Sequence, residues 1–137
     1  MVMVVIVVFL GGMAGILWHY YGGLRTTPGS QAAEVGAKSL RSVREELSAY
    51  SLRAKDAYPA TLDPLGERAR QPVEVASSAG YKLSYSPQPS VGDGVSRGFV
   101  LLARPEKSGY LNLYIDESGV VRATQESRPA TVQDPPF

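Results

Sequence analysis

The fold is decided by the stretch Ser30-Gln-Ala-Ala-Glu-Val-Gly-Ala-Lys-Ser-Leu-Arg-Ser-Val-Arg-Glu-Glu-Leu-Ser-Ala-Tyr50 and the residues that follow it. Small and apolar residues recur here at alternating spacings of three and four, which places them on one face of an α-helix. The members of this face are Gly36, Leu40, Val43, Leu47, Tyr50, Ala54 and Ala57. We therefore expect an amphipathic helix that packs its apolar face on a sheet.

The sequence also suggests where this helix begins and ends. Ser30 is a suitable N-cap, because its hydroxyl can accept a hydrogen bond from a free backbone N–H of the first turn. Pro59 disfavours helical backbone at the residue before it, so we expect the helix to end at about Tyr58. The segment 59–79 contains three prolines and a glycine and is predicted to be an irregular connection.

Beyond Gly80 the apolar period changes from helical to alternating, which is typical of β-strands. Strands are predicted over 81–87, 99–103, 110–116 and 120–123, separated by turns at 92–94, 105–109 and 116–119. The prolines of 128–137 indicate an extended C-terminal tail. The expected fold class is α+β, with the helix of a domain spanning 30–127 laid on a three- to four-stranded antiparallel sheet.

The N-terminal stretch 1–21 is almost wholly apolar, and no charged side chain precedes Arg25. About 20 helical residues span roughly 30 Å, the thickness of the bilayer hydrocarbon, so we expect a single transmembrane helix. Trp18, His19, Tyr20 and Tyr21 follow as an interfacial anchor, and 22–29 reads as a linker or helix interruption. A cleaved signal and a buried core helix are the alternatives; the lack of a basic region and of a small-residue cleavage site disfavours the first.

Three glycines of this stretch, Gly11, Gly12 and Gly15, are candidates for helix packing within the membrane. Gly11 and Gly15 have the spacing that lets two helices approach closely, although glycine is also common in membrane helices without such a role. The expected partners are the lipid bilayer and either identical subunits or other membrane proteins. Arg25 and the basic residues after it favour a cytoplasmic location for the soluble part, but only by a weak charge bias.

The composition favours a protein without catalytic chemistry. The net charge of +1 does not indicate a nucleic-acid surface, the chain has no cysteine, and its single histidine is His19. Asp116 and Glu117 are adjacent and would point to opposite faces of a strand, so they do not form an acid–base pair. We expect no enzyme, metal, cofactor or small-molecule substrate. A calcium site at 116–119, and His19 as a haem or chlorophyll ligand, are the less favoured alternatives.

Four stretches carry a family resemblance, in the order 57–65, 80–87, 114–123 and 128–136: Ala-Tyr-Pro-Ala-Thr-Leu-Asp-Pro-Leu, Gly-Tyr-Lys-Leu-Ser-Tyr-Ser-Pro, Tyr-Ile-Asp-Glu-Ser-Gly-Val-Val-Arg-Ala and Arg-Pro-Ala-Thr-Val-Gln-Asp-Pro-Pro. They resemble the soluble heads of type IV pilin-like proteins and type II secretion pseudopilins. The resemblance implies an anchor in the bacterial inner membrane, a periplasmic or extracellular head, and a structural, non-catalytic role.

The N-terminal stretch departs from the pilin pattern. Pilins carry a short basic leader, which is not seen here, and usually a glutamate as their fifth mature residue, where this chain has Val5. Two functions therefore stay open. The chain is either a pilin or pseudopilin subunit whose stem packs into a filament, or a pilin-like accessory subunit of a larger membrane complex, for example a photosynthetic or respiratory assembly.

Overall fold

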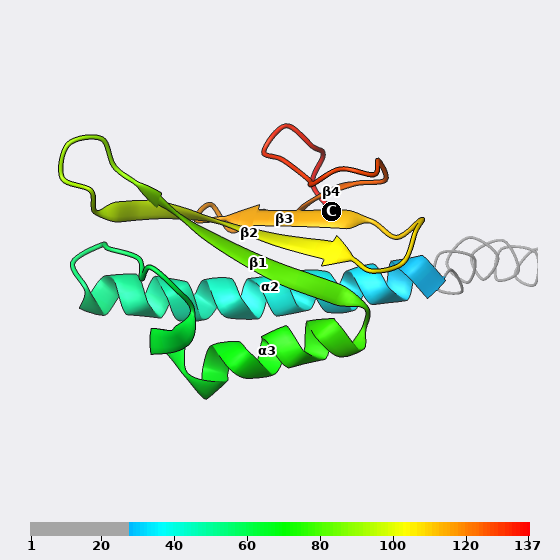
Figure 1. Ribbon diagram of the computed structural model, residues 1–137, viewed down its shortest axis with the longest axis horizontal. Coiled ribbons are helices and arrows are strands. Elements are labelled where there is room, and N and C mark those ends of the chain that lie inside the picture. The colour runs from blue at the N-terminus through cyan, green and yellow to red at the C-terminus, as the bar shows by residue number, and fades with distance from the viewer. Residues whose placement is uncertain (1–27) are drawn as a thin grey trace, which may run out of the picture.

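A computed structural model describes residues 28–137 of the chain, which form a helical layer beneath one four-stranded sheet (Figure 1). The elements follow in the order α2 (Pro28–Arg53), η1 (Asp63–Leu65), α3 (Glu67–Ser78), β1 (Tyr81–Pro89), β2 (Ser96–Pro105), β3 (Asn112–Asp116) and β4 (Arg122–Thr124). The sheet is an antiparallel meander with the strand order β1-β2-β3-β4. The α+β class and the helix packed on an antiparallel sheet are thereby confirmed.

The core lies between α2 and the inner face of the sheet. Four residues of the predicted helical face, Gly36, Leu40, Val43 and Leu47, are buried. They meet inward-facing side chains of the strands, which are Tyr81, Phe99, Leu101, Ala103, Leu113, Ile115 and Ala123. Phe99 anchors one end of this core, because Tyr58 packs edge-on against it at a ring-centroid distance of 4.9 Å. Helical spacing on one element and alternation on the other thus generate a single apolar interface.

The bounds of α2 differ from the prediction at both ends. The described part of α2 starts at Pro28, so Ser30 lies inside the helix and is not its N-cap; residues 28–29 are helical, and 22–27 of the predicted linker or helix interruption lie outside the described residues. The helix ends at Arg53, five residues before Tyr58, because Lys55 and Asp56 adopt left-handed backbone with φ of 56° and 64°.

The prediction of an irregular connection over 59–79 is wrong, because η1 and α3 occupy most of it. Pro64 lies in the first turn of η1, where proline is tolerated, whereas Pro72 lies inside α3. The buried Ala69 and Ala76 give α3 a small-residue face, and α3 packs beside α2 and against β1. This packing compensates for the backbone hydrogen bond that Pro72 cannot donate.

The strands run longer than predicted at β1 and β2, and their register places apolar residues inward. Tyr81 opposes Pro105, Leu83 opposes Ala103, and a bulge interrupts the pairing between Gln88 and Pro89. The 116–119 turn has the expected glycine at its end: Gly119 has a φ of 81°, and its N–H donates to the Asp116 carbonyl at 3.1 Å.

The segment 128–137, for which the sequence predicts only an extended tail, folds back over the end of the sheet formed by β3 and β4 (Figure 1). The Ala123 N–H donates to the Pro135 carbonyl at 3.0 Å, and the Phe137 N–H donates to the Val121 carbonyl at 2.8 Å. The outward-facing Asn112 and Tyr114 are consequently buried, and both faces of β3 are covered.

Candidate functional site

The residues that the sequence nominates for membrane interaction lie outside the described residues. These are Gly11, Gly12 and Gly15 for helix packing, and Trp18, His19, Tyr20 and Tyr21 for the interface. Within residues 28–137, no helix is both long enough and apolar enough to cross a bilayer. The structure therefore bears on function through the surface of residues 28–137, which are called the head below.

A polar groove of about 250 Å³ lies at the end of the sheet near the start of α2. It is bounded by the loop between β2 and β3 and by the segment that follows β4. Its lining includes Arg104, Glu106, Lys107, Tyr110, Asn112, Glu126 and Arg128. The groove thus brings together residues 104–112 and 125–128.

The groove lies close to the beginning of α2 through Tyr110. A side-chain carbon added at Gly29, the second residue of α2, would lie 3.3 Å from the Tyr110 ring. The Lys107 ammonium lies 5.9 Å from the centroid of the same ring. The β2–β3 loop therefore packs its aromatic side chain on the first turn of the helix and carries a cation beside it.

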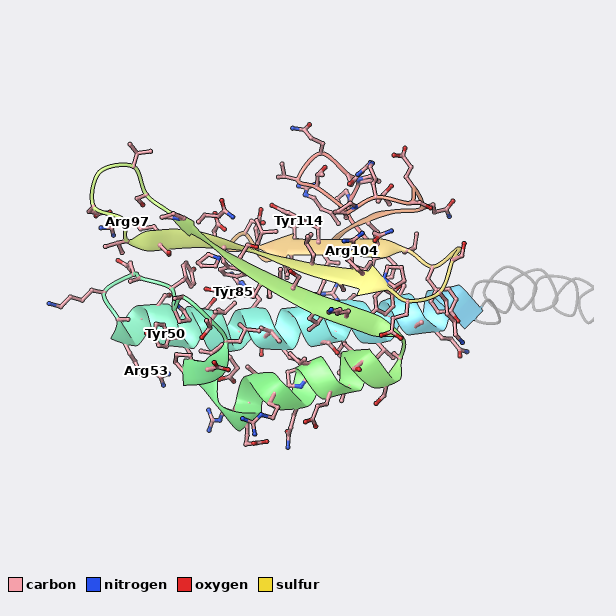
Figure 2. The ribbon with its side chains drawn as sticks, in the orientation of Figure 1. Tyr50, Arg53, Tyr85, Arg97, Arg104 and Tyr114 are labelled. Carbon is pink, nitrogen blue, oxygen red and sulfur yellow. The ribbon has the colours of Figure 1, made fainter. Side chains whose placement is uncertain are left out.

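Two further cations neighbour each other on the outer face of the sheet. In the β1–β2 register, Lys82 is directly opposite Arg104, and both side chains are exposed. Neither makes an ion pair with any residue of the described part. Like charges directly opposite each other in a sheet are unfavourable, so this pair does not stabilise the fold. Figure 2 shows Arg104 towards the end of the sheet where α2 begins, with Arg53 and Arg97 at the other end.

An ion-pair network around Arg128 stabilises the side of the groove that is formed by the segment after β4. The Arg128 guanidinium donates to both carboxylate oxygens of Asp134, at 2.9 and 2.7 Å, and to the Glu126 carboxylate at 2.6 Å. The Arg128 hydrogen bonds, together with the Thr131 N–H, hold the pKa of Asp134 well below its usual range, and the same carboxylates raise the pKa of Arg128. Arg128 is thus occupied by structural partners, whereas Arg104 and Lys107 in the groove, and Lys82 opposite Arg104, are exposed and make no ion pair within the described part.

The 116–119 turn uses its carboxylates for structure. Asp116 accepts hydrogen bonds from Tyr114 Oη at 2.9 Å and from the N–H and hydroxyl of Ser118. Burial raises the pKa of Asp116, but the bonds from Ser118 and Tyr114 outweigh it and lower that pKa below its ordinary value. Glu117 accepts from the Phe99 N–H at 3.2 Å on the other side of the turn. The two carboxylates therefore do not converge on one point.

The same turn is fastened to α2 by Arg44. Its guanidinium donates to the Glu117 carbonyl at 3.1 Å and lies against Gly119, where an added side-chain carbon would be 3.1 Å away. No group of three or more His, Cys, Asp or Glu side chains within 28–137 is arranged to hold a metal ion.

No protein family, characterised protein or solved structure with which we compared the chain matches it. The resemblance to pilin-like heads consequently rests on the four sequence stretches described above. Of these, 57–65 passes into η1, 80–87 enters β1, 114–123 forms the β3–β4 hairpin, and 128–136 covers the sheet.

Sequence reasoning did not find the groove or the facing cations. Lys82 and Arg104 are far apart in the chain, and only the strand register brings them together. The available signal was the alternation over 81–87, which already places Lys82 on the face opposite to Tyr81 and Leu83. The partner strand's register was not readable from the same pattern.

Proposed function

We propose that the protein is a non-enzymatic structural protein of the bacterial inner membrane, anchored by its N-terminal stretch and carrying a pilin-like head. The observation that carries the proposal is the position of α2. This helix begins at one extremity of the long axis of the head, and only 22–27 separate it from the apolar residues 1–21 (Figure 1). An anchor attached there holds the head by one end, as a stem would.

The chemistry of the head supports the same proposal. Its core runs from α2 to β4, the carboxylates of the 116–119 turn accept hydrogen bonds that hold the fold, and the polar groove at residues 104–112 and 125–128 offers cations. The head is suited to presenting a surface and not to transforming a substrate. We place it in the periplasm or outside the cell, as the resemblance implies.

Anchoring and orientation are tested together in bacterial membranes. The wild-type chain has no cysteine, so a single Val91→Cys substitution at the exposed β1–β2 turn gives one labelling site, with the wild type as an unlabelled control. We expect the full chain to resist alkaline extraction, and Cys at position 91 to react with a membrane-impermeant maleimide in intact spheroplasts. Release by alkali would contradict the anchor, and labelling only after lysis would contradict the orientation.

The assembly is tested by native electrophoresis of gently solubilised membranes, with mass spectrometry of the co-migrating proteins. A pilin-type subunit self-associates, whereas an accessory subunit migrates with other membrane proteins. The accessory-subunit function is favoured by the absence of any carboxylate in 1–24. Identical stems packed together would then lack a buried contact between a carboxylate and an amine. Replacing Gly11 and Gly15 with Leu should abolish either association, while Met13→Leu, on the opposite side of an ideal helix, should not.

A further inference from the structure

Three exposed cations, Lys82, Arg104 and Lys107, lie at the end of the head where α2 begins, and are called the basic cluster here. Lys107 is joined to the first turn of α2 through Tyr110 and Gly29, and Lys82 faces Arg104 across the first two strands. Arg104 and Lys107 line one groove. Glu106 lies in that groove as well, so the net charge of this group of four residues is +2.

We propose that the basic cluster binds the anionic headgroups of the membrane that holds the N-terminal stretch; this inference rests on the function proposed above. The cluster thereby fixes the orientation of the head on the bilayer. The group bound by the cluster is the phosphate of the lipid headgroup, which lysine and arginine bind by charge and by hydrogen bonding.

The connection to the anchor limits how far this end of the head can move from the lipid. Seven residue steps separate Tyr21 from Pro28, and a fully extended chain covers at most about 3.6 Å per step, or roughly 25 Å in all. With 1–21 in the bilayer, the basic cluster is therefore held near the headgroups at a high effective concentration. The opposite end, with the β1–β2 turn, lies at the far extremity of the long axis (Figure 1).

The charges of Lys82 and Arg104 favour the binding of an anion from outside the protein, because neither is paired with a carboxylate of the described part. Lys82 and Arg104 repel each other, and no carboxylate of the described part forms an ion pair with either of them. A surface of anionic lipid removes this repulsion and adds attraction for each cation that lies within a Debye length, about 8 Å at physiological salt.

The test measures the position of the head and not the retention of the chain, because the anchor holds the chain in either case. The full chain with a fluorophore on Ser108→Cys, in the β2–β3 loop, is placed in nanodiscs whose lipid headgroups carry a nitroxide quencher. A second sample carries the fluorophore on Val91→Cys. Discs of phosphatidylcholine alone are compared with discs that also contain phosphatidylglycerol.

We expect strong quenching at position 108 in the anionic discs, weak quenching there in the neutral discs, and weak quenching at position 91 in both. The triple variant Lys82→Gln, Arg104→Gln and Lys107→Gln should reduce the ratio of docked to free heads by roughly fivefold per charge, or on the order of a hundredfold. The matched variant Arg53→Gln, Lys55→Gln and Arg97→Gln, which removes three cations from the other end, should leave it unchanged.

Equal quenching at position 108 in neutral and anionic discs would overturn the inference, as would a triple variant that behaves like the matched one. Either outcome is expected if the basic cluster binds an acidic protein partner instead of lipid. Failure of the proposed function looks different, because the chain would then not enter the discs at all. All six substituted side chains are exposed, and unaltered unfolding curves would establish that the variants fold.

Discussion

Gly36 shows how closely α2 approaches the sheet. A side-chain carbon at this position would lie 3.0 Å from Leu113 Cδ1 and 3.2 Å from Tyr81 Cδ2, and both neighbours are fully buried. Tyr81 is also held in place, because its hydroxyl donates to the Leu111 carbonyl at 2.8 Å. The burial of its phenol raises the pKa of Tyr81 to about 12, so this bond persists through the physiological range.

We predict that Gly36→Ala lowers the free energy of unfolding by about 1 kcal/mol. Alanine gains about 1 kcal/mol of helix propensity over glycine, but overpacking a core typically costs about 1–3 kcal/mol. Denaturant titration of the head measures the difference. The control is Gly29→Ala in the same helix, whose neighbour Tyr110 is only half-buried, so this variant should not lose stability. A more stable Gly36→Ala variant would mean that the side chains of Leu113 and Tyr81 shift to accommodate the added carbon.

At the scale of elements, the tail 128–137 depends on one carboxylate. Asp134 joins Arg128 to the Thr131 N–H and is buried although it is charged. Since its folded-state pKa is depressed, the carboxylate stabilises the fold above its unfolded pKa of about 3.9, and this contribution is lost as the pH falls towards the folded value.

We therefore predict that Asp134→Asn destabilises the protein at pH 7 and that the difference from wild type shrinks below about pH 4. Unfolding curves recorded at several pH values would measure it. Asp63→Asn, which removes an exposed carboxylate without an ion pair, serves as the control and should cause little change at any pH. A pH-independent loss for Asp134→Asn would show that the charge of Asp134 does not contribute, and no loss at any pH would show that the tail is held without this side chain.

Elements with strong periodicity could be predicted from the sequence, and elements held by distant contacts could not. The faces of α2 and the four strands follow from local spacing, as at Leu40 and Leu47 or at Tyr81 and Leu83. The helix α3 was not predicted, because Pro72 disfavours helical backbone. The burial of Ala69 and Ala76 that offsets this cost depends on packing against other elements. The groove likewise requires a strand register that no single segment encodes.

At the scale of the whole molecule, the described head has a continuous core of its own. The core cluster extends from Ala37 in α2 to Ala123 in β4 and includes members from every strand. We predict that a fragment spanning 28–137 folds without the apolar stretch. It should unfold cooperatively, with a heat-capacity change of about 1.2–1.5 kcal/mol/K per 100 residues, as calorimetry would measure. A broad transition with little heat absorption would show that the head needs the preceding segment.

The bulge at Gln88 and Pro89 has a consequence for how copies of the chain can meet edge to edge. Pro87 and Pro89 have no N–H to donate, so the last residues of β1 lack regular hydrogen-bond donors, while at the other edge of the sheet the Phe137 N–H already pairs with Val121 beside β4. The 87–89 end of β1 and the position beside β4 are therefore poor templates on which a neighbouring copy could add a strand. If the N-terminal stretch anchors the chain as proposed above, copies held side by side in two dimensions would find few backbone donors at these two positions, which disfavours the addition of strands between neighbours.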